Sequence, residues 1–228
     1  MKKGLYVYGL SGRMGQEVLK IAKASSLFEP LGGYSRAQPT RPSRAPDVVV
    51  DFSLPQALDS LCHLVLEQGS SLVSGTTGFS ADQLNQLRDL GKKVPVFWSA
   101  NMSFGVFIMC KLAEELAKYE HLYKFHIEET HHIHKKDKPS GTALMIASAA
   151  QKSTQELGDT ISHREGEAFG VHSFFATSSR EKLEIRHEAL DRGLFAQGAV
   201  DVASWIVDQK PGFYVMDDYF KSLSKDAN

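Results

Sequence analysis

The sequence predicts an α/β protein whose first half forms a doubly wound parallel sheet and whose second half forms a smaller α+β region with a mixed sheet. In the first half, short apolar runs alternate with amphipathic segments of helical spacing. The connections between them are only a few residues long, as in parallel β-α-β units. In the second half, strands follow one another across polar turns, which favours antiparallel or mixed pairing.

The elements of the first half have clear local signals. Residues 47–53 (DVVVDFS) form a β-branched run, which is typical of a strand buried on both faces. Residues 55–69 are expected to be helical, because Pro55 suits the first helical position and Gly69 suits the position after the last. In all, we expect strands over 4–10, 28–35, 47–53, 71–78 and 94–101, and helices over 16–25, 55–69 and 80–91.

The elements of the second half follow a different order. Residues 103–119 have the spacing of a long amphipathic helix, whereas residues 123–132 alternate in polarity as a strand does. We further expect helices over 142–157 and 195–209 and strands over 171–179 and 181–189. This mixture of helices and turn-connected strands predicts the α+β region.

The composition narrows the class of protein. The chain has 228 residues, of which 23% are charged, and its formal net charge of -1 argues against a dedicated nucleic-acid-binding protein. No apolar run approaches the roughly 20 residues of a membrane span, and glycines from Gly9 onward interrupt the apolar start that a signal peptide needs. Cys62 and Cys110 lie in apolar helical segments, so no disulfide framework is expected. We expect a cytoplasmic protein with neither a nucleic-acid nor a membrane partner.

A glycine turn follows the first expected strand. Gly9, Gly12 and Gly15 occur where a strand leads into a helix, which is the position of the phosphate-binding turn in Rossmann-like dinucleotide-binding domains. The helix start offers N–H donors to a pyrophosphate, and Arg13 could pair with a phosphate. The spacing differs from the commoner GxGxxG pattern, so a glycine-rich turn without a ligand is the alternative.

Three further strand ends could complete a dinucleotide site. Ser35 and Arg36 stand where many such domains place a carboxylate for the adenosine ribose, and a hydroxyl with a guanidinium suits a 2'-phosphate better. This favours NADPH over NADH, unless Arg36 simply faces water. Residues 74–78 (SGTTG) and 99–103 (SANMS) end two later strands at the same expected edge of the sheet, where ligands of open parallel sheets bind.

Residues 131–138 (HHIHKKDK) contain three histidines and three lysines, and a Pro-Ser-Gly-Thr step into a helix follows. A metal site is disfavoured because no carboxylate or cysteine at ligand spacing follows the histidines, so we predict no metal. A nucleic-acid patch lacks interleaved aromatic residues, and a solvated basic turn is the plain alternative. Lys135, Lys138 and the helix start at residues 140–142 together favour an anion-binding site, in which a histidine could exchange a proton.

Seven segments of this chain occur in the order typical of a known family. They are GLSGRMG (9–15), VDFSLP (50–55), GTTGF (75–79), SANMSFGV (99–106), EETHHIHKKDKPSGTAL (128–144), REGEAFGVH (164–172) and FAQGAV (195–200). Together they resemble the 4-hydroxy-tetrahydrodipicolinate reductase (dihydrodipicolinate reductase) family of diaminopimelate and lysine biosynthesis. The resemblance implies NAD(P)H-dependent reduction of a cyclic dicarboxylate and a homo-oligomer, with a tetramer expected. It also implies a dinucleotide-binding domain at 1–102, completed by 193–228, and a substrate-binding and oligomerisation domain at 103–192.

The resemblance also assigns roles to residues of this sequence. His131 resembles the proton donor and Lys135 the second donor and carboxylate partner of the catalytic pair. The implied substrate contacts are His132, Ser140, Gly141 and Thr142. The implied cofactor contacts are Gly9, Leu10, Ser11, Gly12, Arg13, Met14, Gly75, Thr76, Thr77, Ser99, Ala100, Asn101 and Met102, beside Ser35 and Arg36.

Two departures from the family pattern qualify these expectations. Ser35 replaces the acidic residue that many members carry after the second strand, so NADPH is the expected cofactor and NADH use stays open. A strand before residues 163–172 is expected to be missing, which leaves the tetramer less secure than the chemistry. The rival functions are an NAD(P)-dependent reductase for another amino-acid-like imine and a nucleotide sensor without turnover.

Overall fold

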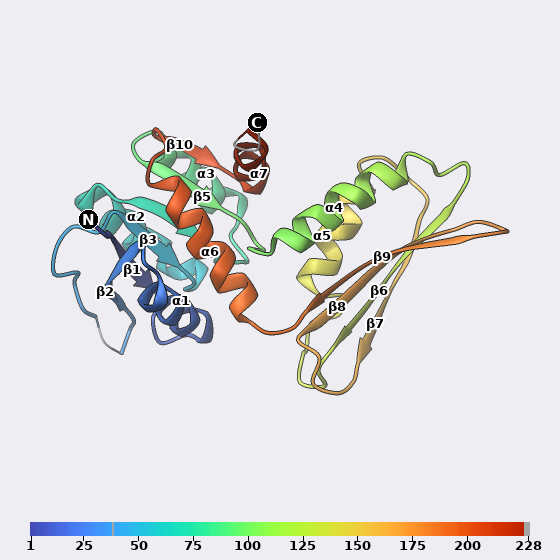
Figure 1. Cartoon of the computed structure of the whole chain (residues 1–228), viewed down its shortest axis with the longest axis horizontal. Coiled ribbons are helices and arrows are strands. Elements are labelled where there is room, and N and C mark those ends of the chain that lie inside the picture. Colours follow the sequence, from blue (N-terminus) through green and yellow to red (C-terminus); the bar gives the residue numbers. More distant parts are fainter. Residues whose placement is uncertain (38, 226–228) are drawn as a thin grey trace. The chain divides into compact units, whose positions relative to one another are not determined.

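The computed structural model describes residues 1–37 and 39–225 and contains two compact units. The first unit consists of Met1–Met102 and the chain from Gly193 onward, and the second consists of Ser103–Arg192. Residues 226–228 of the expected first domain lie outside the described part. Figure 1 shows that each unit has its own sheet and its own covering helices. Among the described residues, no helix combines the length and the hydropathy that crossing a membrane requires.

The first unit contains the predicted doubly wound parallel sheet. Its six strands lie in the order β10-β5-β4-β3-β1-β2, and all neighbours are parallel. Strands β3 and β4 are buried along their whole length, because helices cover both faces of the sheet. The strands are β1 (Lys3–Tyr8), β2 (Phe28–Tyr34), β3 (Val48–Asp51), β4 (Ser71–Ser74), β5 (Pro95–Trp98) and β10 (Gly212–Tyr214).

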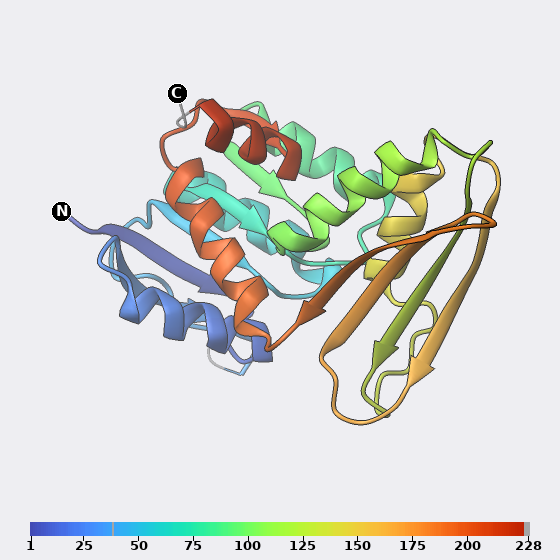
Figure 2. The same cartoon turned by 45° about the vertical axis from the view of Figure 1, so that its right-hand side comes forward.

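Two layers of helices cover this sheet (Figure 2). On one face, α1 (Arg13–Ala24) packs beside α6 (Gly193–Ile206), and the ring of Trp205 meets Phe97 of β5 edge to face. On the other face, η1 (Pro55–Ala57), α2 (Leu58–Gln68) and α3 (Ala81–Gly91) enclose a core formed with alternate residues of β1, β3, β4 and β5. Helix α7 (Met216–Lys225) follows β10. Local signals set two helix boundaries: Ser80 and Gln83 form a capping box, and Gly69 ends α2 with a left-handed φ of 64°.

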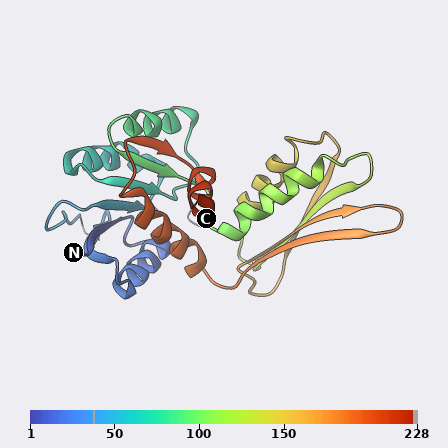
Figure 3. The same cartoon turned by 45° about the horizontal axis from the view of Figure 1, so that its top comes forward.

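The second unit contains the predicted mixed sheet in the order β7-β6-β8-β9. Strand β6 is parallel to β7 and antiparallel to β8, and β8 forms an antiparallel hairpin with β9 that Figure 3 shows clearly. Helices α4 and α5 pack together on one face, over a core that includes Phe125, Ile127 and Phe174. The elements are α4 (Phe104–Ala117), β6 (Lys124–His131), α5 (Gly141–Ala150), β7 (Leu157–Arg164), β8 (Gly170–Thr177) and β9 (Lys182–Ala189).

Two sequence predictions for the second unit are wrong. The helix expected over 142–157 ends at Ala150, and the strand expected to be missing is present as β7. The reason is the polarity of β7, which lies at the sheet edge and places Thr160, Ser162 and Arg164 beside β6. Ser162 and Arg164 interact with the buried carboxylate of Glu129 instead of an apolar core, so the strand lacks the usual apolar alternation.

Candidate active site

The glycine turn of the first unit forms one wall of a cavity. Gly9 has a φ of 91°, and a Cβ atom there would lie 2.6 Å from the carbonyl oxygen of Phe52. A Cβ atom on Gly15 would lie 2.4 Å from the carbonyl oxygen of Gly9, so both positions require glycine for the close strand–helix approach. Helix α1 begins at Arg13 without a side-chain cap and without an acidic residue in its first turn. Its N-terminus therefore presents backbone donors and a positive dipole end to an anion.

The cavity has a volume of about 290 Å³ and joins the turn to the end of β2. It brings together five residues predicted from the sequence, namely Gly9, Ser11, Gly12, Ser35 and Arg36. Leu10, Arg13 and Met14 belong to the same turn but do not line the cavity. The remaining lining residues are mostly flat or apolar: Tyr8, Tyr34, Phe52, Ser53, Leu54 and Ala57. This second group could not be predicted from the sequence, because aromatic residues at strand ends have the same pattern as core residues until the loops are placed.

A buried carboxylate joins the ends of β3 and β4. Asp51 is fully buried and accepts hydrogen bonds from the Ser74 hydroxyl (2.7 Å), the Thr76 hydroxyl (2.8 Å) and the Ser53 amide (3.0 Å). Burial raises the pKa of Asp51, although these hydrogen bonds oppose the shift. The Trp98 indole N–H donates to the carbonyl oxygen of Thr76, which adds β5 to the same set of contacts. The three strand ends therefore form one rigid edge.

The predicted residues at this edge differ in accessibility. Thr77 and Ala100 are exposed, and Gly75 and Asn101 are half-buried. Gly75 allows the Phe52 ring to approach, since a Cβ atom there would lie 2.2 Å from the ring. Thr76, Ser99 and Met102 are buried, so their side chains mainly hold the segment in place.

In the second unit, a buried carboxylate lies at the centre of the predicted catalytic segment. Glu129 of β6 is 1% exposed. Its Oε1 atom accepts hydrogen bonds from the Ser140 amide (3.1 Å) and the Arg164 guanidinium (2.8 Å). Its Oε2 atom lies 3.0 Å from Nδ1 of His131 and 3.8 Å from Nε2 of His172. Burial alone would raise the pKa of Glu129, but the polar groups of neighbouring residues, with Ser140 first, lower it to about 2.

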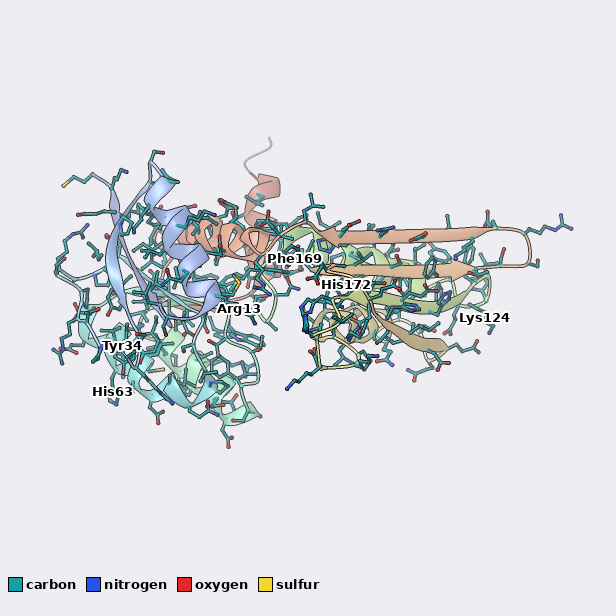
Figure 4. The ribbon with its side chains drawn as sticks, turned by 90° about the horizontal axis from the view of Figure 1, so that it is seen from below. Arg13, Tyr34, His63, Lys124, Phe169 and His172 are labelled. Carbon is teal, nitrogen blue, oxygen red and sulfur yellow. The ribbon has the colours of Figure 1, made fainter. Side chains whose placement is uncertain are left out.

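Figure 4 shows His172 near one end of the second sheet, with Lys124 toward the other end. The His172 ring meets His131 edge to face at a centroid distance of 5.1 Å, and its Nε2 lies 3.1 Å from the Ser140 hydroxyl. That hydroxyl oxygen also caps α5 by accepting from the Ala143 amide. Burial, reinforced by the neighbouring histidines, lowers the pKa of His172 to about 3, so this ring is neutral near pH 7.

The loop between β6 and α5 positions the other predicted residues. Lys135 forms an ion pair with Asp137 at 2.8 Å and has a side chain that is 23% exposed. His132 is half-buried and its amide donates to the carbonyl oxygen of Ala168. Gly141 is exposed at the first residue of α5, whereas Ser140 is buried with its amide and hydroxyl already engaged. The accessible part of the predicted anion site is therefore Lys135 and the start of α5.

Three potential metal ligands of the second unit lie close together. One potential ligand atom from each of Glu129, His131 and His172 lies within 4.8 Å of the others. However, the guanidinium of Arg164 is hydrogen-bonded to the same carboxylate, and Lys135 lowers the pKa of His131 through its charge. These positive charges oppose the binding of a cation beside the three side chains.

Comparisons with known proteins agree with this geometry. A family model described as "Dihydrodipicolinate reductase, N-terminus" matches residues 4–102, and one described as "Dihydrodipicolinate reductase, C-terminus" matches residues 105–220. The 4-hydroxy-tetrahydrodipicolinate reductase of Bdellovibrio bacteriovorus is 39% identical over 222 residues, which cover 95% of this chain and 96% of the relative. That of Alkaliphilus oremlandii is 36% identical over 233 residues, which cover 94% and 97%.

Solved structures show the same fold. The chain superposes on a dipicolinate-bound dihydrodipicolinate reductase from Paenisporosarcina sp. TG-14 with a TM-score of 0.77 and 21% sequence identity, covering 94% of this chain and 98% of that one. An amine dehydrogenase from Mycobacterium smegmatis gives a TM-score of 0.63 at 9% identity, covering 94% and 95%. The architecture is therefore shared with other dehydrogenases.

Proposed function

The chain belongs to the dihydrodipicolinate reductase family, and we infer from this that it catalyses the NAD(P)H-dependent reduction of 4-hydroxy-tetrahydrodipicolinate to tetrahydrodipicolinate. It is thus an oxidoreductase of diaminopimelate and lysine biosynthesis. The observation in this chain that supports the activity best is the position of His131: its Nδ1 lies 3.0 Å from the buried carboxylate of Glu129, the charge of Lys135 acts on the ring, and the same carboxylate binds the amide that precedes α5. This arrangement offers a proton next to a site for an anionic substrate.

The first unit is proposed to bind the dinucleotide. Its uncapped α1 N-terminus and the adjoining cavity fit a pyrophosphate and an adenosine moiety, and the bound cofactor supplies a hydride. The cofactor contacts proposed from the sequence stay Gly9, Leu10, Ser11, Gly12, Arg13, Met14, Ser35, Arg36, Gly75, Thr76, Thr77, Ser99, Ala100, Asn101 and Met102. We propose a preference for NADPH, because Arg36 is exposed at the cavity wall and none of the described residues that line the cavity carries a carboxylate.

The second unit is proposed to bind the substrate. Lys135 would exchange its partner Asp137 for a substrate carboxylate, and the N–H groups at Gly141 and Thr142 would bind the same anion. His132 is the further proposed contact. Ser140 acts by holding the start of α5 against Glu129 and His172. His131 then delivers a proton to the substrate carbon that becomes electron-rich during reduction.

The decisive experiment is a spectrophotometric assay of cofactor oxidation in the presence of 4-hydroxy-tetrahydrodipicolinate. Parallel reactions contain NADPH or NADH as the cofactor. Turnover is expected with both cofactors, at lower KM for NADPH. A protein that binds NADPH but turns over no cyclic imine dicarboxylate would be the nucleotide sensor, and activity confined to another imine would identify the rival reductase.

Two variants test the proposed catalytic pair. His131→Ala is expected to lower kcat by roughly 10²- to 10⁴-fold, the usual range for general acid catalysis, while the Kd for NADPH stays unchanged. Lys135→Ala is expected to cost more in kcat/KM, because a substrate carboxylate also loses its counter-charge. Normal turnover in either variant would remove that residue from the mechanism.

The assembly and the location of the protein are also proposals. Among the described residues, one face of the second sheet carries no helix, and on this face the Phe175 ring stacks against His126 and lies 3.8 Å from Nζ of Lys182. We propose that this face joins copies of the chain into a tetramer in the cytoplasm. Sedimentation velocity at micromolar concentration measures the assembly, and a monomer would contradict it.

A further inference from the structure

Glu129 is the most completely enclosed ionisable side chain of the second unit's site, and no sequence pattern assigned it a role. It lies on β6 two residues before His131, so both side chains project to the same side of the strand. The Arg164 guanidinium and the Ser140 amide bind Oε1, which leaves Oε2 directed at the imidazole of His131. The carboxylate is thus fixed from two neighbouring elements, β7 and the start of α5.

We propose that Glu129 is a positioning residue that acts through His131, holding a hydrogen on Nδ1 and directing Nε2 toward the reacting substrate. The proposal rests on the proposed role of His131 as the proton donor. The arrangement is the one in which a buried carboxylate fixes the tautomer and orientation of a catalytic histidine and stabilises its protonated form. Glu129 itself touches neither substrate nor cofactor.

The surroundings of the imidazole agree with this assignment. A Cβ atom on Gly170 would lie 2.9 Å from Nε2 of His131, so the glycine leaves space beside the nitrogen that exchanges the proton. Nδ1 of His131 and Oε2 of Glu129 are both buried and lie 3.0 Å apart, close enough to share a proton, and neither atom has a hydrogen bond that meets geometric criteria to another described residue. Without the carboxylate beside Nδ1, either ring nitrogen could carry the hydrogen. A ring free to adopt both tautomers would deliver the proton less often.

The charge of Glu129 also affects when His131 can donate. Burial lowers the pKa of His131, Lys135 and Arg164 lower it further, and Glu129 and Asp137 raise it. His172 adjoins the pair as a neutral ring, and His187 lies beyond it at a centroid distance of 6.5 Å from His172. Removing the carboxylate charge would therefore shift the protonation of His131 to lower pH.

The test is a double-mutant cycle between Glu129→Gln and His131→Ala. Alone, Glu129→Gln is expected to lower kcat by roughly 10²-fold and at most as far as His131→Ala, with the KM for NADPH unchanged. In the His131→Ala background the same change is expected to have no further effect, because its target is already gone. A structural role would lower kcat equally in both backgrounds, and that outcome would overturn the proposal.

The pH profile provides a second readout. Because the proton donor must be protonated, kcat/KM falls on the alkaline side as His131 loses its proton, and Glu129→Gln is expected to move this limb to lower pH. An unmoved limb would contradict the proposal. The matched control is Glu128→Gln, which changes the neighbouring carboxylate on the opposite face of β6, 3.3 Å from His126, and should leave the profile unchanged.

Folding of the variants is controlled separately. Glu129→Gln leaves the buried guanidinium of Arg164 without its counter-charge, so the double variant Glu129→Gln/Arg164→Met removes both charges together. Nitrogen-15 NMR of the histidine rings then reads the tautomer directly. We expect the Nδ1–H form of His131 in the wild type and a mixture in this folded double variant. An unchanged tautomer in the double variant would overturn the proposal. A wild-type protein that does not reduce the substrate would instead contradict the proposed function.

Discussion

Acidification should destabilise the second unit, and His172 gives the size of the effect. The residue is 4% exposed and its pKa is lowered to about 3, whereas an unfolded histidine has a pKa of about 6.5. Between these values the unfolded state binds a proton that the folded state does not, so the free energy of unfolding falls as the pH falls. The stabilisation is complete above pH ~6.5 and is lost progressively down to pH ~3.

These pKa values predict a loss of about 2 kcal/mol between pH 7 and pH 5 from His172 alone. A folded-state pKa as high as about 4 would leave this loss almost unchanged, because the buried ring is still neutral at pH 5. Burial also lowers the pKa values of His131 and His187, so both act in the same direction. The free energy of unfolding of the second unit should therefore fall by more than the contribution of His172 alone.

The assay compares wild type with His172→Gln by hydrogen exchange at pH 7, 6 and 5, corrected for the chemical exchange rate. Between pH 7 and pH 5, protection of the β6 and β8 amides should fall about 30-fold more in wild type than in the variant, the equivalent of about 2 kcal/mol. Trp98 and Trp205 both lie in the first unit, so tryptophan fluorescence is an internal control. Equal losses of protection in wild type and variant would refute the reasoning.

Two further predictions concern the first unit. Arg36→Ala should raise the KM for NADPH by roughly 10- to 100-fold, which corresponds to the loss of one charged hydrogen bond to a phosphate. The KM for NADH should stay unchanged, and equal effects on both cofactors would count against a contact between Arg36 and the 2'-phosphate. Asp51→Ala should lower the free energy of unfolding by about 2–4 kcal/mol, because it leaves the buried hydroxyl groups of Ser74 and Thr76 without their acceptor. Urea titrations followed by tryptophan fluorescence measure this loss, and a value below about 1 kcal/mol would show that the strand ends do not depend on Asp51.

Much of the fold could be predicted because its signals are local. The β-branched run at β3, the Pro55 and Gly69 boundaries and the Ser80 cap each act within a few residues, and the structure places elements there. The elements missed or misplaced are those without a local apolar signal. Strand β7 is polar because its residue Arg164 binds the buried carboxylate of Glu129. The three-residue strand β10 is too short to show a periodic pattern of polarity.

The candidate site divides in the same way. The sequence by itself determined the glycine turn, because only glycine fits at positions 9 and 15, and it placed His131 and Lys135 in one segment before a helix start. Only the tertiary structure decided which groups contact the residues of this site. Glu129 accepts a hydrogen bond from Arg164, 35 residues away in the sequence, and the Ser140 hydroxyl lies within hydrogen-bond distance of His172, 32 residues away. The physical reason is that side-chain periodicity encodes which face of an element is buried, whereas the register between strands decides which buried polar groups become partners.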